Sequence, residues 1–422
     1  MASFSFSSGN MAKLVRIPLY VAGRLATVVI PRSTDEWVYG CGAGVGDGAL
    51  ALWNEAAAQH PSVWLVGNER ERREAAALGI PTIRRHSARG FWRTARARVV
   101  VVTHGFGDVN RYAIGGAFIA QLWHGIPLKR VGIDSPETVQ VPAVLRRLPV
   151  ARLVRAVLRL AYRRTTRQIG LLPAASHLVR GRLESAFSLA DAHVPVTGEP
   201  RVDVLSRGDA AQRRRTARAV IGATVGDVGE RRLVLYAPTW RDGVEDAAIP
   251  DAAEWDAILA MLEARDAVLL VRSHPLGAGR YAPPRTTDRV RMLGSDVLAD
   301  VTPVLSGLDV FLTDYSSLLY DVTLVPLPTV LLAPDLEAYT ARRGLYGTYA
   351  DVGGDGAART WAEAIAQLDG VLADDRVREQ RVARARALDA LVHAHRDGGN
   401  AARVHAGIVA GVARASAGRR AR

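Results

Sequence analysis

Four segments of the chain place polar side chains directly after short apolar runs. The first, residues 121–129, reads QLWHGIPLK. His124 ends an apolar run, and the glycine and proline that follow it favour a tight turn. An imidazole titrates near neutral pH, so a histidine presented to a cleft can take a proton from an attacking hydroxyl group. Taken alone, this segment is equally consistent with a structural histidine whose hydrogen bonds are made within the protein.

Two further segments carry arginine at such positions. Residues 235–242 read LYAPTWRD, and Thr239 and Arg241 are candidates for phosphate contacts because a guanidinium group makes bidentate hydrogen bonds. The alternative is a surface turn without a ligand. The next segment reads VRSHP, in which Arg272 and His274 project to the same side if the strand continues. This pair would clamp a pyrophosphate, unless the segment is a strand end that simply faces solvent.

The fourth segment, residues 308–322, reads LDVFLTDYSSLLYDV and joins a buried strand to a helix. The strand is expected to end at Thr313, and Asp314 or Ser316 is the expected N-cap of the helix. Free backbone N–H groups and the positive end of the helix dipole, together with the hydroxyls of Ser316 and Ser317, would bind an anion without a metal. The alternative is an ordinary helix cap with no ligand.

These segments need the strands of a parallel sheet to position them. Short, continuously apolar runs recur with helix-length spacers, which is typical of strands that are buried on both faces and covered by helices. The runs are residues 63–66, 99–102, 118–123, 169–172, 233–237, 268–271, 310–313 and 330–333. The fold class is therefore α/β, and functional side chains should follow the carboxyl ends of the strands.

The chain is long enough for two domains, because 422 residues exceed the usual size of one hydrophobic core. Residues 206–232 are polar and rich in arginine, and we place the linker between the domains there. The expected parts are a leader, an N-terminal domain, a C-terminal domain, and terminal helices with a basic tail, over residues 1–32, 33–215, 216–365 and 366–422.

The charge of the chain indicates an anionic partner. Lysine and arginine number 55 against 42 acidic residues, which gives a formal charge of +13. Nucleic acid, anionic lipid and phosphorylated substrates all attract such a protein, although a general bias of composition toward alanine, arginine, glycine and valine would also explain part of the excess. Because no basic strand face with interleaved aromatic residues can be found, we expect no nucleic-acid partner.

Motifs for metals, phosphate loops and thiol chemistry are missing from the sequence. Cys41 is the single cysteine, which excludes an internal disulfide framework and a cysteine-rich zinc site. The patterns GxxxxGK[ST], HExxH, CxxC and DxD are also absent. We therefore expect a reaction without metal or cofactor, in which cationic side chains and helix ends balance the charge of the leaving group.

Two segments are candidates for contact with a membrane surface. Residues 141–168 contain eight arginines and no acidic residue, and at helical spacing four arginines gather opposite an apolar face that includes Leu153 and Val157: Arg152, Arg155, Arg159 and Arg163. Such a helix lies on anionic lipid, or it packs in the core with arginine on its polar face. Residues 14–31 are apolar but shorter than the roughly 20 uninterrupted residues of a spanning helix, so they form a surface helix or a buried first element.

Six motifs, taken in order, resemble those of the CDP-glycerol glycerophosphotransferase family, the polymerases and primases of wall teichoic acids and related capsule polymers. The motifs are QLWHGIPLKRVGID at 121–134, TGEPRVDVL at 197–205, LYAPTWRD at 235–242, RSHP at 272–275, LDVFLTDYSSLLYD at 308–321 and DLEAYTARRGLYGTY at 335–349. The resemblance extends over about residues 37–353. Two departures occur: residues 40–48 read GCGAGVGDG in place of a serine-rich segment, with Asp47 retained, and Ile126 replaces a frequent threonine.

The resemblance implies a GT-B-like pair of Rossmann-type domains whose parallel sheets face a central cleft. It implies a CDP-polyol donor bound to the C-terminal domain and an acceptor that is lipid-linked or is the growing polymer. The enzyme would work as a peripheral protein at an anionic membrane surface, on the cytoplasmic face of the cell membrane. A GT-B glycosyltransferase that uses a nucleotide-sugar donor for a cell-surface glycan is the alternative.

The same resemblance assigns roles to individual residues. His124 would be the general base toward the acceptor hydroxyl, and His274 would also take part in catalysis. The donor diphosphate and nucleotide would be held by residues of the later motifs, namely Arg241, Arg272, His274, Thr313, Asp314, Ser316 and Ser317. The acceptor side would include Asp47, Gly125 and Lys129. The implied reaction is in-line attack on the β-phosphorus, with CMP as the leaving group.

Overall fold

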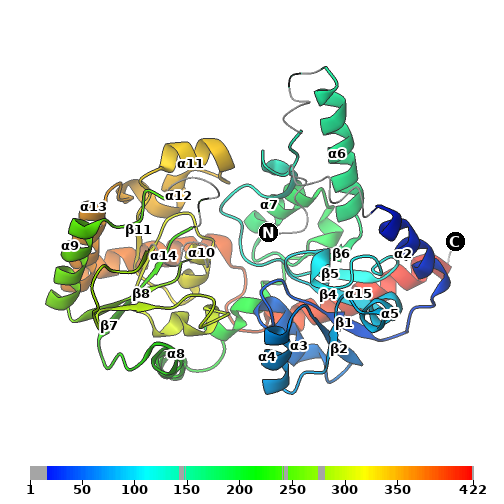
Figure 1. Cartoon of the computed structure of the whole chain (residues 1–422), viewed down its shortest axis with the longest axis horizontal. Coiled ribbons are helices and arrows are strands. Elements are labelled where there is room, and N and C mark those ends of the chain that lie inside the picture. The colour runs from blue at the N-terminus through cyan, green and yellow to red at the C-terminus, as the bar shows by residue number, and fades with distance from the viewer. Residues whose placement is uncertain are drawn as a thin grey trace. The chain divides into compact units, whose positions relative to one another are not determined.

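The computed structural model describes residues 17–141, 147, 149–239, 241, 246–273 and 281–420. The chain forms two compact units, whose elements are labelled in Figure 1. The first unit contains Met1–His124, Arg130–Asp203 and Asp397–Arg422, and the second contains Gly125–Lys129 and Val204–Arg396. Neither unit is one continuous stretch of sequence.

The first unit is built on a six-stranded parallel sheet with the order β3-β2-β1-β4-β5-β6. The strands are β1 (Trp37–Tyr39), β2 (Ser62–Val66), β3 (Thr82–Arg84), β4 (Val99–Val102), β5 (Phe118–Gln121) and β6 (Ile169–Leu171). All four valines of β4 are buried, as expected of a strand that helices cover on both faces. The strand order runs outward in both directions from the β1/β4 pair, which is the doubly wound arrangement of Rossmann-type folds.

Seven α-helices belong to the described part of the first unit: α2 (Ile17–Val29), α3 (Asp47–Ala56), α4 (Glu69–Ala77), α5 (Ala88–Arg96), α6 (Ala151–Thr166), α7 (His177–Phe187) and α15 (Asn400–Arg420). Helix α15 packs against α3 and β6 and contributes Val404 and Ile408 to the core. The carboxylate of Asp203 accepts hydrogen bonds from the N–H groups of Asn400 and Ala401 at 3.0 and 2.8 Å, which satisfies the start of α15. The C-terminal helix therefore completes the first unit.

The second unit has a five-stranded parallel sheet with the order β11-β10-β7-β8-β9. Its strands are β7 (Arg232–Ala237), β8 (Ala267–Val271), β9 (Val290–Met292), β10 (Val310–Thr313) and β11 (Thr329–Leu331). Its α-helices, within the described residues, are α8 (Ala210–Val225), α9 (Ala252–Ala264), α10 (Leu318–Asp321), α11 (Leu336–Arg343), α12 (Tyr349–Gly353), α13 (Trp361–Ala373) and α14 (Asp375–Val392). Helices α9 and α13 pack on the sheet to form the core on one face.

The polar segment at residues 206–232, where the sequence places the linker, contains helix α8. The carboxylate of Asp209 accepts a hydrogen bond from Gln212 N at 2.8 Å and caps this helix. Arg214 of α8 donates a hydrogen bond to Asp309 at 2.9 Å, just before β10. Residues 210–225 are therefore an integral helix of the second unit, and the two units divide between Asp203 and Val204.

The remaining helical elements are short. Single 3-10 turns or pairs of turns lie at Phe106–Asp108, Gly132–Asp134, Asp191–His193, Pro200–Leu205, Thr302–Gly307, Val322–Leu324 and Gly354–Gly356. Among the residues that the structure describes, no helix is long and apolar enough to cross a membrane.

Candidate active site

The first part of the site lies at the carboxyl edge of the sheet in the first unit. Cys41 and Asp47 follow β1, His104 follows β4 and His124 follows β5, and these three strands are neighbours in the sheet. Parallel strands bring their carboxyl ends to one edge, and the β1/β4 junction is where the strand order reverses. Ligands bind at such a junction in open α/β sheets.

His124 is half-buried and is held between aromatic neighbours. Its ring centroid lies 4.2 Å from that of Trp123 and 4.3 Å from that of His104. Trp123 adopts a left-handed backbone conformation, with φ of +61°, and Gly125 follows with φ of +129°. A side chain other than glycine in this region is strained, and such strain is common where a structure must present a functional residue. The tight turn expected after His124 is present.

The pKa of His124 is lowered well below its ordinary value of 6.5, first by burial and then by the neighbouring His104. The imidazole is therefore neutral at pH 7 and keeps the lone pair that a general base needs. We accordingly expect any activity that depends on His124 as a base to fall only at pH values below 6.5.

His104 is a site residue that the sequence analysis missed. Its Nδ1 lies 2.8 Å from Thr103 Oγ1, and the carboxylate of Asp108 accepts hydrogen bonds from the N–H groups of Thr103 and His104 at 2.9 and 2.8 Å. The sequence signal was available, because the valine run at 99–102 is followed by Thr-His-Gly, as the run at 118–123 is followed by His-Gly.

Three potential metal ligands also meet at this edge, because donor atoms of Cys41, Asp47 and His104 lie within 4.8 Å of one another. Burial, and then the charge of Asp47, raise the pKa of the Cys41 thiol well above its ordinary value. Thr103 Oγ1 donates a hydrogen bond to Cys41 Sγ at 3.2 Å and also contacts His104 Nδ1. Thr103 thus already contacts both Cys41 and His104, and we assign no metal to this group.

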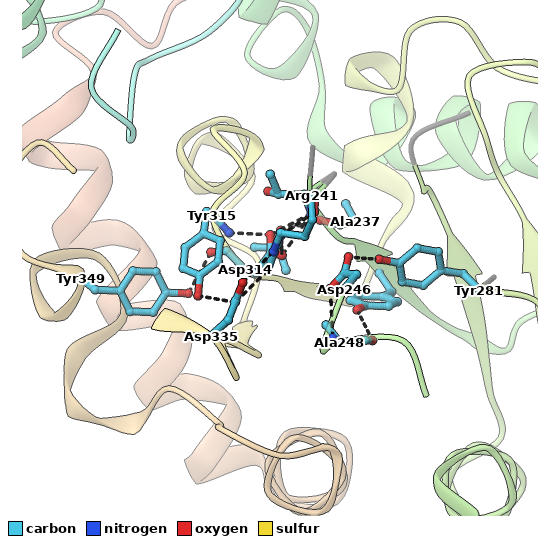
Figure 2. A network of polar contacts seen from close by, with 12 residues as sticks. Ala237, Arg241, Asp246, Ala248, Tyr281, Asp314, Tyr315, Asp335 and Tyr349 are labelled. Atoms are coloured by element: carbon cyan, nitrogen blue, oxygen red, sulfur yellow. Dashed lines mark hydrogen bonds and ion pairs between the residues drawn. The ribbon is translucent and has the colours of Figure 1, made fainter. Parts of the chain in front are cut away.

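The second part of the site lies at the carboxyl edge of the sheet in the second unit and is shown in Figure 2. The carboxylate of Asp314, after β10, accepts hydrogen bonds from Thr239 N at 2.9 Å and from Arg241 Nη1 at 2.8 Å. Arg241 also donates two hydrogen bonds to Asp335, at 2.9 and 3.0 Å, and Tyr315 donates one to the same carboxylate. Arg241 thus joins three loops of the unit.

Arg241 has a different environment from the one the sequence suggested. Burial opposes its charge, but its hydrogen bonds to Asp335 and the charge of Asp314 outweigh this and raise its pKa above the ordinary value. Its guanidinium group also lies over the rings of Tyr315 and Tyr339, 4.9 and 5.0 Å from their centroids. The contacts that the structure gives Arg241 are therefore those of a residue that fixes the loops around it.

Thr313, Ser316 and Ser317 lie at the end of β10. Thr313 Oγ1 donates a hydrogen bond to Ala237 O at 2.7 Å and so ties the ends of β10 and β7 together. The serines are half-buried, and Ser317 is the N-cap of α10 without a capping side-chain bond. The prediction that Asp314 or Ser316 is the N-cap was wrong. Because α10 has four residues, its dipole is small, and an anion here would depend on hydroxyl and N–H groups.

Arg272, after β8, is occupied by backbone carbonyl groups. Its guanidinium donates hydrogen bonds to the oxygens of Leu293, Leu298 and Ala299, at 3.1, 2.8 and 3.0 Å, and holds the loop after β9. Burial lowers its pKa. His274 lies outside the described residues, as do Trp240 and Asp242 of the neighbouring motif.

Two buried hydroxyl groups at this edge have no partner within the described part of the chain, Thr239 Oγ1 after β7 and Ser273 Oγ after β8. A buried polar atom without a hydrogen bond is costly and is often satisfied by a ligand or ordered water. Since β10, β7 and β8 are adjacent, these hydroxyls and the Ser316–Ser317 pair follow three neighbouring strands. Ser273 could not be predicted from the sequence, because a serine between Arg272 and His274 has no pattern that marks it as buried.

Of the residues assigned to the acceptor side, Asp47 lies in the first unit, whereas Gly125 and Lys129 belong to the second. Lys129 forms an antiparallel bridge with Leu345, and Tyr346 N donates a hydrogen bond to Leu128 O at 2.9 Å. The segment after His124 is therefore fixed to residues 345–346 of the second unit. Asp47 begins α3 with φ of +58°, a second strained position at the carboxyl edge of the first sheet.

Helix α6 projects away from the sheet of the first unit (Figure 1) and exposes both charged and apolar residues. Arg152, Arg155, Arg159 and Arg163 are exposed, and Leu153, Val157 and Leu160 are 64, 57 and 65% exposed. Only Ala151, Tyr162 and Thr166 are buried, so the alternative of a core helix was wrong. Helix α2 also exposes apolar side chains, among them Leu25, Val28 and Val29, so residues 17–29 are not a buried first element.

Comparison with solved structures confirms the expected fold class. A structure of the wall teichoic acid polymerase TagF aligns with a TM-score of 0.74 and 19% identity over 97% of this chain and 99% of that one. A UDP-N-acetylglucosamine 2-epimerase aligns with a TM-score of 0.51 and 13% identity over 89% of this chain and 95% of that one. These similarities show that the chain has an α/β fold of the GT-B-like kind with two Rossmann-type parts.

Two relatives with low sequence identity are enzymes of teichoic acid synthesis. A teichoic acid glycerol-phosphate transferase of Staphylococcus aureus is 25% identical over 238 residues, which is 54% of this chain and 56% of that protein. A teichoic acid poly(glycerol phosphate) polymerase of Bacillus subtilis is 24% identical over 279 residues, which is 64% of this chain and 34% of that protein. The matched region thus spans about half of the first relative's length and a third of the second's.

A family model matches nearly the whole chain. It covers residues 41–410, which include both sheets from β2 onward, both histidines of the first edge and the Asp314–Arg241 network of the second. All six sequence motifs therefore lie within the region that this family model matches. The chain belongs to the CDP-glycerol:poly(glycerophosphate) glycerophosphotransferase family.

Proposed function

We propose that this protein transfers a polyol phosphate, such as glycerol phosphate, from a CDP-activated donor to a hydroxyl group of an acceptor in teichoic acid or capsule-type polymer synthesis, with release of CMP. The observation that carries the proposal is the position of His124 at the carboxyl edge of β5, beside Trp123 and stacked on His104, in a chain of this family. A polymerase of similar fold, TagF, has been soaked with CDPG in a histidine variant, which supports a donor of this class.

On the acceptor side, His124 takes the proton of the attacking hydroxyl as the new P–O bond forms. The attack falls on the β-phosphorus in line with the bond to CMP, which breaks as the nucleotide leaves with the bond's electron pair. A base held near its substrate contributes about 10²- to 10⁴-fold to such a step. Asp47, Gly125 and Lys129 would contact the acceptor around this point.

On the donor side, hydroxyl groups and backbone N–H groups of the second unit would bind the diphosphate. Thr239 and Ser273 supply buried hydroxyls that have no partner among the described residues, and Ser316 and Ser317 supply half-buried ones. Arg241 and Arg272 act on the same site by fixing its loops through Asp314, Asp335 and the carbonyl groups after β9. His274 would complete the donor site, and neither a metal nor another cofactor takes part in this scheme.

The donor class can be tested directly with purified protein. Incubation with CDP-glycerol, CDP-ribitol and UDP-sugars, each with a lipid-linked or oligomeric acceptor, should release CMP from a CDP-polyol and leave the UDP-sugars intact. Release of UDP without CMP would instead identify a glycosyltransferase that moves a sugar from a nucleotide donor.

The acceptor is proposed to be a lipid-linked molecule or the growing polymer, reached from the cytoplasmic face of the cell membrane. The exposed arginines of α6, with Leu153, Val157 and Leu160 beside them, have the character of a helix that lies on anionic lipid. In such a helix the guanidinium groups contact the headgroups while the apolar side chains enter the lipid boundary. The protein would therefore be peripheral.

Replacement of Arg152, Arg155 and Arg159 by glutamate should weaken binding to vesicles that contain phosphatidylglycerol by about a hundredfold, because each basic residue near an anionic surface contributes about 1 kcal/mol. Vesicle co-sedimentation measures this. The matched control carries the same charge change at exposed positions elsewhere, Arg73, Arg89 and Arg386, and should bind nearly as the unmodified protein does. Equal loss in both variants would mean that net charge, and not α6, governs binding.

A further inference from the structure

His104 and His124 form an unusual pair at the carboxyl edge of the first sheet. Their ring centroids are 4.3 Å apart and their planes differ by 3°, so the imidazoles are stacked face to face. They follow adjacent strands, β4 and β5, and both are half-buried. None of the roles assigned above to the donor or to the acceptor uses His104.

The position of His104 is set by its own loop. The carboxylate of Asp108 accepts hydrogen bonds from Thr103 N and His104 N, which fixes the backbone after β4. Thr103 Oγ1 lies 2.8 Å from His104 Nδ1 and limits rotation of the ring. Gly42 packs against the ring so closely that a Cβ atom there would come within 2.6 Å of His104 Cγ. The His104 ring therefore fits beside residue 42 only because that residue is glycine.

Charged groups from several loops surround the pair. Within the described part of the chain, the charged or titratable groups near the two rings include Cys41, Asp47, Asp108 and Arg201. Two stacked imidazoles cannot both carry a proton without strong repulsion at 4.3 Å.

We propose that His104 is a positioning residue for His124: its stacked ring fixes the plane of the His124 imidazole, so that a ring nitrogen of His124 faces the acceptor hydroxyl. This inference rests on the proposed function. His104 makes no bond to the reacting atoms in this scheme. Its effect is exerted through the orientation of the His124 ring.

Two variants of His104 separate this role from simple packing. His104→Phe keeps an aromatic ring that can stack but removes the titrating nitrogens, and His104→Ala removes both. We expect His104→Ala to lower kcat by about a hundredfold, the size of effect that follows from misplacing a catalytic group by about 1 Å, with the donor KM changed less than about threefold. We expect His104→Phe to recover at least a tenth of the original kcat.

A second measurement does not depend on turnover. The Cε1–H signal of His124, assigned by comparison with His124→Gln, can be followed by NMR against pH in the full-length protein, which has 10 histidines. Loss of the neighbouring ring and charge should move the His124 midpoint upward in His104→Ala, because both lower it in the unmodified protein. The acidic limb of the kcat/KM profile should move in the same direction.

The outcomes distinguish this inference from the proposed function. If CMP release proceeds but His104→Ala leaves both kcat and the His124 midpoint unchanged, His104 has no positioning role. If the His124 midpoint shifts in His104→Ala but no donor supports transfer, the two outcomes separate. The interaction between the two rings is then supported, and the proposed reaction is wrong. A His104→Ala protein that loses its folded NMR spectrum is replaced by His104→Phe, whose His124 midpoint must then also rise for the inference to hold.

Discussion

His124→Ala is expected to lower turnover by about 10²- to 10⁴-fold while leaving the binding of CDP-glycerol nearly unchanged. The size follows from the contribution of a positioned general base, and the selectivity follows because the proposed donor contacts lie in the second unit. Turnover would be measured as CMP release under saturating donor, and donor affinity by calorimetry. Because His124 is half-buried against Trp123 and His104, the variant must also show an unchanged thermal transition.

Two further variants make this result specific. His124→Gln preserves the shape of the side chain but cannot accept the proton, and it should be as inactive as His124→Ala. His177→Ala removes an exposed histidine of α7 and should retain full turnover. Retention of more than a tenth of the activity in His124→Gln would show that another group serves as the base.

Asp314→Asn is expected to destabilise the protein by about 3–5 kcal/mol and to abolish donor binding. The side chains of Arg241 and Asp314 are 4 and 1% exposed, and without the charge of Asp314 the buried guanidinium group is balanced by Asp335 alone. The same carboxylate accepts the hydrogen bond of Thr239 N, so the loop after β7 would also lose its anchor. Urea unfolding followed by tryptophan fluorescence gives the stability, and calorimetry gives the affinity.

The matched control for this prediction is Asp369→Asn. The pair of Arg265 and Asp369 has similar geometry, with a distance of 2.6 Å, but its side chains are 35 and 41% exposed. Exposed ion pairs contribute about 0–1 kcal/mol, so this variant should unfold nearly as the original protein does. Equal effects of the two substitutions would argue against a special role for the buried network.

Much of the fold could be predicted from the sequence because its strands are buried on both faces. The valine run of β4 and the apolar runs of β7, β8 and β10 have no polar alternation, which is typical of a parallel sheet beneath helices. Strands β3 and β9 were missed because each contains an arginine, and β1 was missed because its apolar run of three residues is shorter than the predicted runs. Helix α8 was missed because its arginines read as a linker, although Asp209 and the alanines that follow support a capped helix.

The candidate site was predicted in part. His124 and the loop after β10 were found because each follows an apolar run, but side-chain partners distant in sequence could not be seen. Arg241 meets Asp335, 94 residues later, and Arg272 meets the carbonyl groups of the β9 loop. The sequence of a motif therefore does not show whether its arginine binds a phosphate of the ligand or a carboxylate of the protein. His104 was missed because attention fell on the longer motif around His124.

The most direct test of the account is to determine which bond of the donor breaks. CDP-glycerol would be incubated with protein and acceptor, and the products followed by ³¹P NMR together with chromatography of the nucleotide. Transfer of glycerol phosphate predicts one CMP for each new phosphodiester. Release of CDP, or a product that contains the polyol without its phosphate, would contradict attack at the β-phosphorus and with it the proposed reaction.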